Sequence, residues 1–454
     1  MHRHSVTPLV LASALFLGGA GCHHKKTAST DGGTDGSTPG GDGGTVGDAG
    51  MGGDAGVACG KLPPTGASQV VQPSTGTDEL GRGVRVGVDK AGRPLLAYLD
   101  APINGGLQTL YVQRWDDCAG AWRSAVKVDD TISSIGTGQT VFALSVDPTS
   151  GIVGIAYLKK ATLATSAAPS QTVFVAQSTD DGATFASAKV SKHAVENGAG
   201  AGDLDDAGEP NIVLGGGKTY VAYVQNNTAC PPSNSGCAEA VVLATGTIGT
   251  YTYAHMRDST DASHGGDFAA RAFTLGLALD SAGTPGIVAH QEPVSGSTVL
   301  AFWRPGQQNF VTITDSAGVQ NDDGAAALAY DGLAPRVVSR LQQGMLSNSN
   351  IYDLVFSSSA DGLGWSTVAL PRPESIANSQ SIQAHAGTVS IVAGGPHLFR
   401  STNLIDFTVD GLALAQGSSS TGSSLTAAGK LWAVAEGITP PADVTGGVVF
   451  YREP

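Results

Sequence analysis

The sequence has little charge, few aromatic side chains and few basic residues. Only 14% of its 454 residues are charged and 6% are aromatic, and 25 Lys and Arg stand against 39 Asp and Glu, a net charge of −14. Binding to nucleic-acid phosphates requires clustered Lys and Arg, so this balance excludes a basic nucleic-acid-binding protein. We therefore expect no nucleic-acid partner.

The sequence also lacks the residues of long helices and the apolar runs of membrane spans. With 63 Gly in the chain, too few Glu, Lys, Leu and Arg remain for a coiled coil or a helical bundle. No internal apolar run approaches the roughly 18 residues of a membrane-spanning helix. The length suits two or three average domains, or one large all-β domain behind a secretion leader.

The first 22 residues have the pattern of an export signal. A short basic start precedes the apolar residues 6–20, and small residues come before Cys22. The order Leu-Gly-Gly-Ala-Gly-Cys over residues 17–22 resembles a bacterial lipobox, although Gly19 stands where Leu is usual. We predict a lipoprotein-type signal peptide over residues 1–22 that ends at a lipidated Cys22. The alternative is an ordinary signal peptide and a soluble secreted protein.

Residues 23–58 form a Gly/Asp-rich segment of low complexity. Between Asp31 and Gly56 there are twelve Gly and five Asp and no aromatic residue. Such a segment buries too little apolar area to offset its ordering entropy, so we predict a disordered tether of roughly 30–36 Å before a globular head, residues 59–454. The tether resembles those of myxobacterial surface lipoproteins. This resemblance implies a cell-envelope location, anchored to the outer membrane, or secretion where the anchor is lacking.

Five cysteines fit an oxidising compartment. If Cys22 carries lipid, four remain for two disulfides: Cys59, Cys118, Cys230 and Cys237. A bond between the last two would close a turn-rich loop, and a bond between the first two would tie the start of the head to its first sheet. A zinc site is the alternative interpretation, but no CxxC spacing or His pair supports it.

From residue 60 onward, an apolar strand, an Asp/Gly turn and a second strand recur seven times. The turns run from Asp89-Lys-Ala-Gly to Ala427-Ala-Gly, at intervals averaging about 56 residues, and a β-rich repeat of this length indicates a β-propeller. Most units carry a second hairpin, first seen at residues 109–128, so four strands make one blade. We predict an all-β propeller of seven four-stranded blades, with six as the alternative. Residues 68–72 would supply the missing outer strand of the last blade.

The turn between the third and fourth strands of the second unit carries a sharp motif. It matches the Asp box, Ser-x-Asp-x-Gly-x-Thr-(Phe/Trp), at every defined position: Ser178, Asp180, Gly182, Thr184 and Phe185. Degenerate copies follow at residues 359–365 and 401–407. In such a turn Ser and Asp bind backbone amides, Gly takes a positive φ, and the aromatic ring packs between sheets. The head therefore resembles the Asp-box (BNR) propellers of the sialidase-like superfamily, which implies that this motif is structural and lies opposite the active site.

In propellers of this kind, ligands bind at the axial face formed by the loops that enter each innermost strand. Those loops hold 18% of the 396 residues after Ala58, but 16 of the 34 acids and only 4 of the 22 bases. Exposed loops favour Asp because Asp makes turns; the alternative is an acidic mouth that binds Ca²⁺ or a cationic ligand. The candidates for this cation- or ligand-binding face are Asp203, Asp205, Asp206, Asp258, Asp261, Asp267, Asp322 and Asp323.

The catalytic signatures of sialidases are missing from the sequence. Their early Arg-Ile-Pro motif is absent, and an acid-rich, arginine-poor mouth disfavours an anionic sugar. We therefore expect a non-enzymatic, monomeric surface module that binds a glycan or a protein, needs no cofactor and has no catalytic residue. The alternative is a glycoside hydrolase acting on non-anionic glycans, which requires two carboxylates about 5–9.5 Å apart. A purely structural envelope protein is the third hypothesis.

Overall fold

The chain divides into two units, residues 1–56 and 57–454, and the computed structural model describes parts of the second. The leader and tether expected at residues 1–22 and 23–58 lie outside the described residues. The described residues are 59–71, 78–102, 107–132, 141–161, 170–191, 207–226, 239–256, 270–293, 299–315, 326–346, 349–374, 380–393, 397–412, 421–438 and 445–454.

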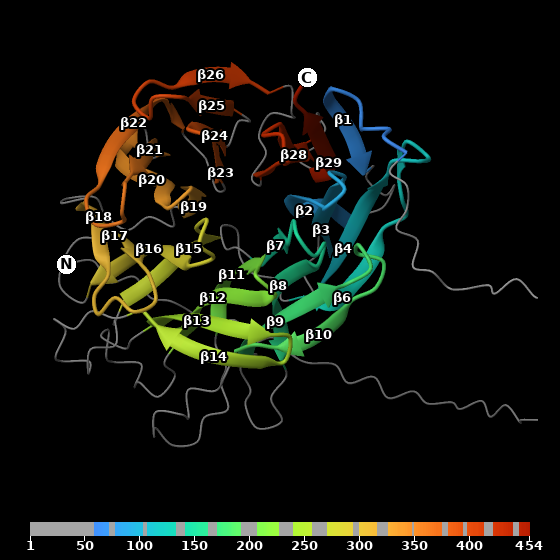
Figure 1. The fold of residues 1–454 in the computed structure, drawn as a ribbon, viewed down its shortest axis with the longest axis horizontal. Coiled ribbons are helices and arrows are strands. Elements are labelled where there is room, and N and C mark those ends of the chain that lie inside the picture. The colour runs from blue at the N-terminus through green and yellow to red at the C-terminus, as the bar shows by residue number, and fades with distance from the viewer. Residues whose placement is uncertain are drawn as a thin grey trace, which may run out of the picture. The chain divides into compact units, whose positions relative to one another are not determined.

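Within these ranges the head consists of antiparallel β-sheets, and they contain no helix that could cross a membrane (Figure 1). The first sheet along the chain contains β2 (Asp78–Val88), β3 (Pro94–Pro102), β4 (Gln108–Asp116) and β6 (Val126–Ile132), with the short β5 (Ala121–Trp122) paired to β4. The second contains β7 (Phe142–Val146), β8 (Val153–Ala161), β9 (Ser170–Ser178) and β10 (Ala186–Lys189). A single pairing of Ile132 with Lys159 links the two.

Four separate four-stranded sheets follow. The third sheet contains β11 (Ala207–Gly215), β12 (Lys218–Asn226), β13 (Glu239–Thr247) and β14 (Thr250–His255). The fourth contains β15 (Ala270–Leu279), β16 (Pro285–Pro293), β17 (Val299–Trp303) and β18 (Val311–Asp315). The fifth contains β19 (Ala326–Asp331), β20 (Ala334–Leu346), β21 (Ser349–Ser358) and β22 (Ser366–Glu374). The sixth contains β23 (Gln380–His385), β24 (Thr388–Ala393), β25 (His397–Ser401) and β26 (Thr408–Gly411).

The last sheet joins the beginning and the end of the head. It contains β27 (Thr421–Leu425), β28 (Leu431–Ile438) and β29 (Thr445–Arg452), and its outer strand is β1 (Gly66–Val71). Strand β1 runs antiparallel to β29, with Gly66 opposite Arg452. The outer strand expected at residues 68–72 is thus β1, which covers residues 66–71.

The first strand of each sheet faces a common centre. Adjacent first strands contact one another in cyclic order, and all of them line one cavity: β2, β7, β11, β15, β19, β23 and β27. Figure 1 shows the sheets arranged around this centre. The head is therefore an all-β propeller built from four-stranded antiparallel sheets.

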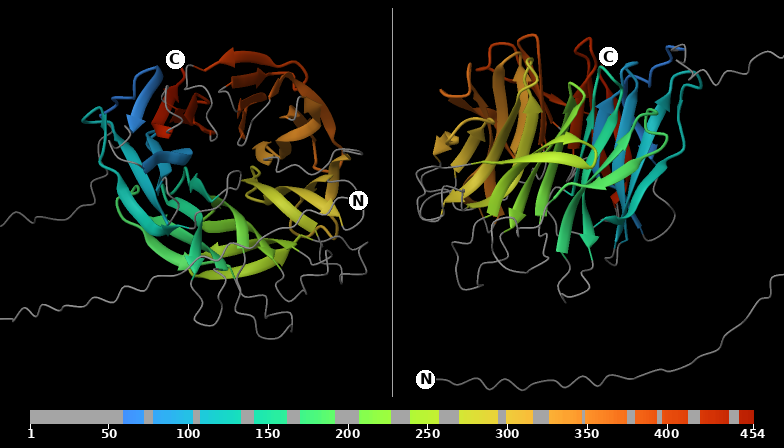
Figure 2. Two further views of the ribbon diagram at one scale, coloured as in Figure 1. Left: turned by 180° about the vertical axis from the view of Figure 1, so that it is seen from behind. Right: turned by 60° about the horizontal axis from the view of Figure 1, so that its bottom comes forward.

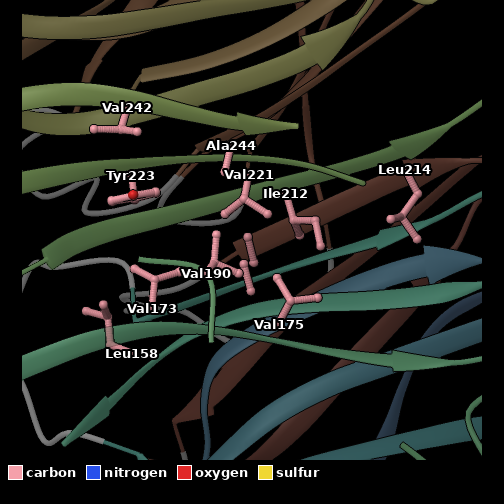
Figure 3. Packing of buried hydrophobic residues seen from close by; sticks show 12 residues of the cluster. Leu158, Val173, Val175, Val190, Ile212, Leu214, Val221, Tyr223, Val242 and Ala244 are labelled. Carbon is pink, nitrogen blue, oxygen red and sulfur yellow. The ribbon is translucent and has the colours of Figure 1, made fainter. Parts of the chain in front are cut away.

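The core lies between neighbouring sheets, because each sheet is apolar on both faces. Along β8, Ile155 and Tyr157 belong to the cluster shared with the first sheet, whereas Ala156 and Leu158 belong to the cluster shared with the third. Figure 3 shows the second of these clusters, in which Ile212 of β11 packs among side chains of both sheets. The two-residue period of a strand thus buries both faces of the sheet.

Small residues on the second strands let neighbouring sheets approach closely. Six alanines at equivalent positions have no exposed surface: Ala97, Ala156, Ala222, Ala289, Ala393 and Ala435. At Gly154 of β8, an added Cβ would lie 2.9 Å from the Cδ1 atom of Leu214, closer than carbon atoms pack. These positions explain the small residue that recurs in every repeat of the sequence.

The sheets have two different ends. The turns between first and second strands, and between third and fourth strands, lie at one end, which we call the turn face. The right-hand view of Figure 2 shows it along its upper edge, beside the carboxyl terminus. The other end, the loop face, is where each first strand begins, next to residues outside the described ranges.

The turn between β9 and β10 is held by side-chain hydrogen bonds on the turn face. The Ser178 hydroxyl donates to Asp180 Oδ1 at 2.6 Å and accepts from the Gly182 amide at 2.7 Å. Asp180 Oδ2 accepts from the Thr184 hydroxyl at 2.7 Å. Gly182 has a φ of +83°, and Phe185 packs against the core between the first two sheets.

Related turns stand at the same place in the fifth and sixth sheets. In the sixth, the Ser401 hydroxyl accepts from the Leu404 amide at 2.9 Å, and Asn403 Oδ1 accepts from the Asp406 amide at 2.9 Å. The aromatic ring that follows packs on a neighbouring ring, Phe407 on Phe356, with centroids 5.1 Å apart. The side-chain oxygen of Asn403 therefore accepts turn hydrogen bonds, as the Asp180 carboxylate does in the second sheet.

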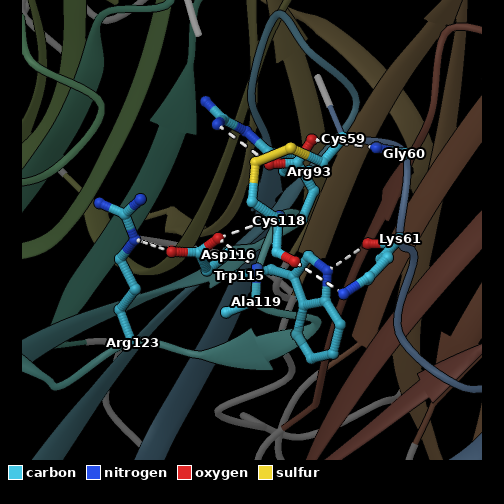
Figure 4. The surroundings of a disulfide bond; sticks show 10 residues. Cys59, Gly60, Lys61, Arg93, Trp115, Asp116, Cys118, Ala119 and Arg123 are labelled. Atoms are coloured by element: carbon cyan, nitrogen blue, oxygen red, sulfur yellow. Dashed lines mark hydrogen bonds and ion pairs between the residues drawn. A yellow bond between two sulfur atoms is a disulfide. The ribbon is translucent and has the colours of Figure 1, made fainter. Parts of the chain in front are cut away.

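A disulfide between Cys59 and Cys118 joins the segment before β1 to the turn after β4 (Figure 4). Around it, the Lys61 ammonium donates to the Cys118 carbonyl at 2.8 Å, and the Trp115 indole donates to the Lys61 carbonyl at 2.6 Å. This bond takes two of the cysteines that a zinc site would need. The other predicted pair, Cys230 and Cys237, lies outside the described residues.

Asp180 makes part of the stability of the head depend on pH. Partial burial acts to raise its pKa, but hydrogen bonds from Ser178, Thr184 and the turn amides lower the pKa to about 2. Because the unfolded-state pKa is about 3.9, the stabilisation is complete above about pH 4 and is lost as the pH falls toward about 2. We expect Asp180→Asn to remove this pH dependence. The side-chain oxygen of the new Asn still accepts hydrogen bonds from the turn amides, as that of Asn403 does, so the turn is kept.

The melting temperature measures this effect. Between about pH 5 and pH 2, the wild type loses its advantage over Asp180→Asn, so the gap between the two melting temperatures narrows. Thr184→Val, which removes one hydrogen bond to the Asp180 carboxylate, serves as the matched comparison and retains only part of this pH dependence. Parallel curves for the wild type and Asp180→Asn would show that the carboxylate contributes no pH-dependent stability.

Candidate functional site

A central cavity of about 790 Å³ runs between the first strands. This volume lies within the range of small-molecule sites in proteins. Its lining is apolar where Val, Leu and Ile of the first strands face it, and it includes a set of polar side chains: Arg85, Ser145, Asn211, Gln380, Ser381, Gln383 and Ser423.

Most of these polar groups bind the neighbouring sheet. Asn211 Nδ2 donates to the Leu275 carbonyl at 2.8 Å, and Gln383 Nε2 donates to the Ser423 carbonyl at 2.9 Å. The hydroxyls of Ser381 and Ser423 lie 2.7 Å apart. Since each bond joins adjacent first strands, these side chains fasten the ring together around the cavity.

The described carboxylates of the cavity lining are engaged in turns. Asp280, 7% exposed, accepts through Oδ1 from the amides of Ala282 and Thr284, both at 2.9 Å. Asp147, 4% exposed, accepts from the Ser150 hydroxyl at 2.7 Å. Each of these two buried aspartates accepts hydrogen bonds from its own tight turn on the turn face. Glycoside hydrolysis requires two carboxylates facing a substrate, and this part of the cavity does not supply them.

Arg85 brings a positive charge to the cavity. Its guanidinium carbon lies 5.7 Å from the centroid of the Phe142 ring, and Nη1 donates to the Val84 carbonyl at 2.9 Å. A cation over an aromatic face is held by the quadrupole of the ring. Arg85 is therefore fixed between the first two sheets.

A half-buried ion pair lies between the first two sheets. Asp129 Oδ2 accepts from the Tyr157 hydroxyl at 3.0 Å and from the Lys159 ammonium at 3.1 Å. Burial acts to raise the pKa of Asp129, but its hydrogen bonds with Thr131, Lys159 and Tyr157 outweigh burial and lower the pKa. A carboxyl group that stays ionised at neutral pH is no general acid, and the hydrogen bonds of Asp129 join the first two sheets.

The tyrosines of the second strands are structural. Tyr98, Tyr157 and Tyr223 are each at most 3% exposed. Burial, together with Tyr111 and Asp100, raises the pKa of Tyr98 to about 12, and burial also raises the pKa of Tyr157. A tyrosine nucleophile needs an easily lost proton, so neither residue is activated for attack on a sugar.

One group of described residues has the composition of a metal site, but it is already engaged. Asp116, Asp117 and Cys118 cluster on the turn face. Cys118 is bonded to Cys59, and Asp116 accepts from the Arg123 guanidinium at 2.9 Å. This group therefore lacks the free thiolate that a transition metal would take.

All eight aspartates predicted for the cation- or ligand-binding face lie outside the described residues, so this Ca²⁺ site stays a prediction. They are Asp203, Asp205, Asp206, Asp258, Asp261, Asp267, Asp322 and Asp323.

Irregular pairing marks the loop-face ends of the first strands. The register shifts between Gly208 and Asn211 in β11, and again between Ala272 and Leu275 in β15. Such bulges re-aim side chains and are frequent beside active sites. The shift in β11 places Glu209 in a bulge on a strand that lines the axis. Glu79 lies in β2, another first strand, with Ala101 as its register partner.

Glu79 and Glu209 are among the sixteen acids of the loops that enter the first strands, and neither was among the predicted site residues. A cue was present at Glu209, because the next residue is Pro210, and proline within a strand is confined to edges and bulges. The cue shows that a bulge is required, but the pairing pattern is needed to place it beside the axis.

Alkaline titration distinguishes buried from activated tyrosines. Since the folded-state pKa of Tyr98 is about 12 and the unfolded value is about 10, the neutral phenol stabilises the fold below about pH 10, and this contribution is lost as the pH rises to about 12. Because burial also raises the pKa of Tyr251 and of Tyr330 to about 12, we expect the tyrosinate absorbance step near pH 12 to be smaller by one tyrosine in Tyr98→Phe than in the wild type. An unchanged neutral-pH circular dichroism spectrum is the control. If the absorbance that Tyr98→Phe loses titrates near pH 10 instead of near pH 12, this assignment is contradicted.

No protein-family model matches the sequence, and no curated protein matches it either. Solved structures do share the fold. An α-L-arabinofuranosidase from Fusarium graminearum, in complex with an iminosugar inhibitor, has a TM-score of 0.52 at 14% identity and covers 87% of this chain and 98% of its own. The GH93 α-L-arabinofuranosidase of the same organism with arabinobiose has a TM-score of 0.51 at 14% identity, covering 85% and 97%. The polysaccharide lyase Uly1 has a TM-score of 0.50 at 11% identity, covering 87% and 95%.

These similarities correct the functional prediction. They are consistent with the all-β propeller fold expected from the sequence. The expectation of a non-enzymatic module, however, is wrong, because the solved structures that share this fold over nearly their whole length include glycoside hydrolases. The alternative interpretation, a glycoside hydrolase, is the one that the comparisons favour. At these identities, what the chains share is the propeller fold.

Proposed function

We propose that the head is a glycoside hydrolase that acts on neutral glycans, with α-L-arabinofuranosides as the first substrates to test. The observation that carries the proposal is the shared fold. It extends over 87% of this chain and 98% of an α-L-arabinofuranosidase, and a related complex contains arabinobiose. A fold shared over this length supports a search for the catalytic groups around the axis, at the loop face.

The charge of the loop face supports a neutral substrate. The loops that enter the first strands hold 16 of the 34 acids after Ala58 and only 4 of the 22 bases. A mouth of this charge repels sialic acids and uronic acids. It is compatible with an uncharged pentose, whose recognition depends on hydrogen bonds to hydroxyl groups.

We assign the catalytic pair to Glu209 and Glu79. Both belong to first strands, which line the axis, and Glu209 lies within the bulge of β11. In such a pair, one carboxylic acid protonates the departing glycosidic oxygen. The other carboxylate attacks the anomeric carbon or activates a water molecule. A separation of about 5–5.5 Å would retain the anomeric configuration, and about 6.5–9.5 Å would invert it.

We propose that the ring has seven blades. The support is that seven first strands contact one another in a cycle and line one cavity. We also propose that export and lipidation at Cys22 hold the head in the cell envelope, as a monomer. The support for this is the lipobox-like order of residues 17–22 and the Gly/Asp-rich tether that follows.

Turnover on a defined glycan panel tests the proposed activity. We expect the full chain to hydrolyse aryl α-L-arabinofuranosides or arabinan, and to leave sialosides and uronides intact. Glu209→Gln and Glu79→Gln each lower kcat by about 10²–10⁴-fold, because Gln neither transfers a proton nor attacks the sugar. Asp361→Asn, an exposed change on the turn face, leaves kcat unchanged.

The panel also shows what would refute the proposal. Absence of turnover on every neutral glycan would remove the hydrolase function. Turnover that survives both Glu→Gln changes would move catalysis to other carboxylates of the loop face. Melting temperatures of the two variants within a few degrees of the wild type show that lost turnover reflects chemistry and not unfolding.

A further inference from the structure

Exposed apolar side chains gather on the turn face. The described part of the head has five large apolar side chains with high exposure: Leu62 at 45%, Leu107 at 44%, Leu333 at 56%, Leu363 at 61% and Ile405 at 67%. Leu107 directly precedes β4, near the loop face. The other four lie on the turn face, and three of them belong to the adjacent fifth and sixth sheets. Single exposed apolar residues are ordinary, but their concentration on one face is not.

Two of these side chains stand at the tips of rigid turns. The amide of Leu363 donates to Asp361 Oδ1 at 2.8 Å, and the amide of Ile405 donates to Asn403 Oδ1 at 3.0 Å. In the corresponding turn of the second sheet, the tip residue is Ala183. These hydrogen bonds already fix the backbone of each tip. Presenting the large side chain at the surface therefore costs no further backbone entropy.

The chain enters the head on the same face. Cys118 lies in the turn after β4, and its bond to Cys59 ties the segment before β1 to that turn. The Lys61 amide donates to the Asp117 carbonyl at 3.2 Å, and β1 begins at Gly66, opposite Arg452 near the end of β29. Cys59 is therefore held at the turn face by the disulfide drawn in Figure 4.

We propose that the turn face lies against the lipid bilayer that carries the Cys22 anchor, with the apolar tips in its interfacial layer. The loop face, which carries the proposed hydrolase site, then faces away from the membrane. A tether of roughly 30–36 Å keeps the head within reach of the bilayer. At the resulting millimolar effective concentration, a weak apolar contact is enough to orient the head. This orientation holds whether or not the head is a hydrolase.

The charges of the two faces favour the same orientation. The loop face concentrates acids and would be repelled by anionic headgroups. The turn face exposes cations at its turns: Lys61, Lys90, Arg123, Lys218 and Lys430. Several of its aspartates, among them Asp89 and Asp280, are buried and bound to turn amides. These cations lie on the first, third and last sheets, whereas the exposed Asp361 and Asp406 stand beside the apolar tips of the fifth and sixth sheets. Apolar contact at the tips, and not charge beside them, therefore carries the proposed orientation.

Depth-dependent fluorescence quenching tests this orientation. The full, processed chain is placed in vesicles that contain brominated lipids, as the wild type, as Ile405→Trp and as Leu107→Trp. The five native tryptophans give the common baseline. We expect the emission added by Ile405→Trp to be quenched and the emission added by Leu107→Trp to be unaffected. Quenching of the Leu107→Trp emission alone, or of neither, would overturn the proposal and leave the turn face to a protein or glycan partner.

Vesicle flotation without the anchor gives an independent measurement. The full chain with Cys22→Ser is compared with the same chain carrying Leu363→Asp and Ile405→Asp, on anionic vesicles. We expect the two substitutions to weaken partition by roughly tenfold, with unchanged melting temperature because both side chains are exposed. Equal partition of the two proteins, or absence of lipid on Cys22 of the wild type, would overturn the proposal. Glycan turnover is unchanged in either case, so this outcome is separable from that of the hydrolase test.

Discussion

Close packing between sheets that are apolar on both faces is the interaction on which the rest of this structure depends. Along β12, Tyr220 and Ala222 enter one intersheet cluster, while Val221 and Tyr223 enter the other. A sheet with two apolar faces needs a neighbour on each side, and a series of such sheets satisfies this need by closing around an axis. The small residue at positions such as Ala222 sets how closely neighbours approach, and so keeps the ring compact.

Because the middle of every sheet is used for packing, chemistry is left to the two ends. On the turn face, the carboxylates of buried Asp280 and its equivalents accept hydrogen bonds from turn amides. The surface there is formed by short, rigid turns. On the loop face, first strands such as β11 begin with shifted register. One end therefore suits attachment, and the other suits substrate binding.

The failed expectation of a non-enzymatic module has a physical cause. A nucleophile elbow or a zinc helix leaves a motif because its groups are neighbours along the chain. Glycoside hydrolysis asks only for two carboxylates at a suitable distance, and those can come from strands as far apart in sequence as the ones that carry Glu79 and Glu209. A missing motif is thus no argument against this chemistry.

The sequence by itself determined the features that arise from nearby residues. Alternating apolar strands, Asp/Gly turns and the Ser178–Phe185 turn could be identified because their hydrogen bonds and faces involve residues at most a few positions apart. Tertiary structure alone decided that the bulge of β11 lies beside the axis, and that Cys59, Leu363 and Ile405 share one face. Those relations join residues hundreds of positions apart, and they depend on how successive sheets pack around the ring, which no local pattern encodes.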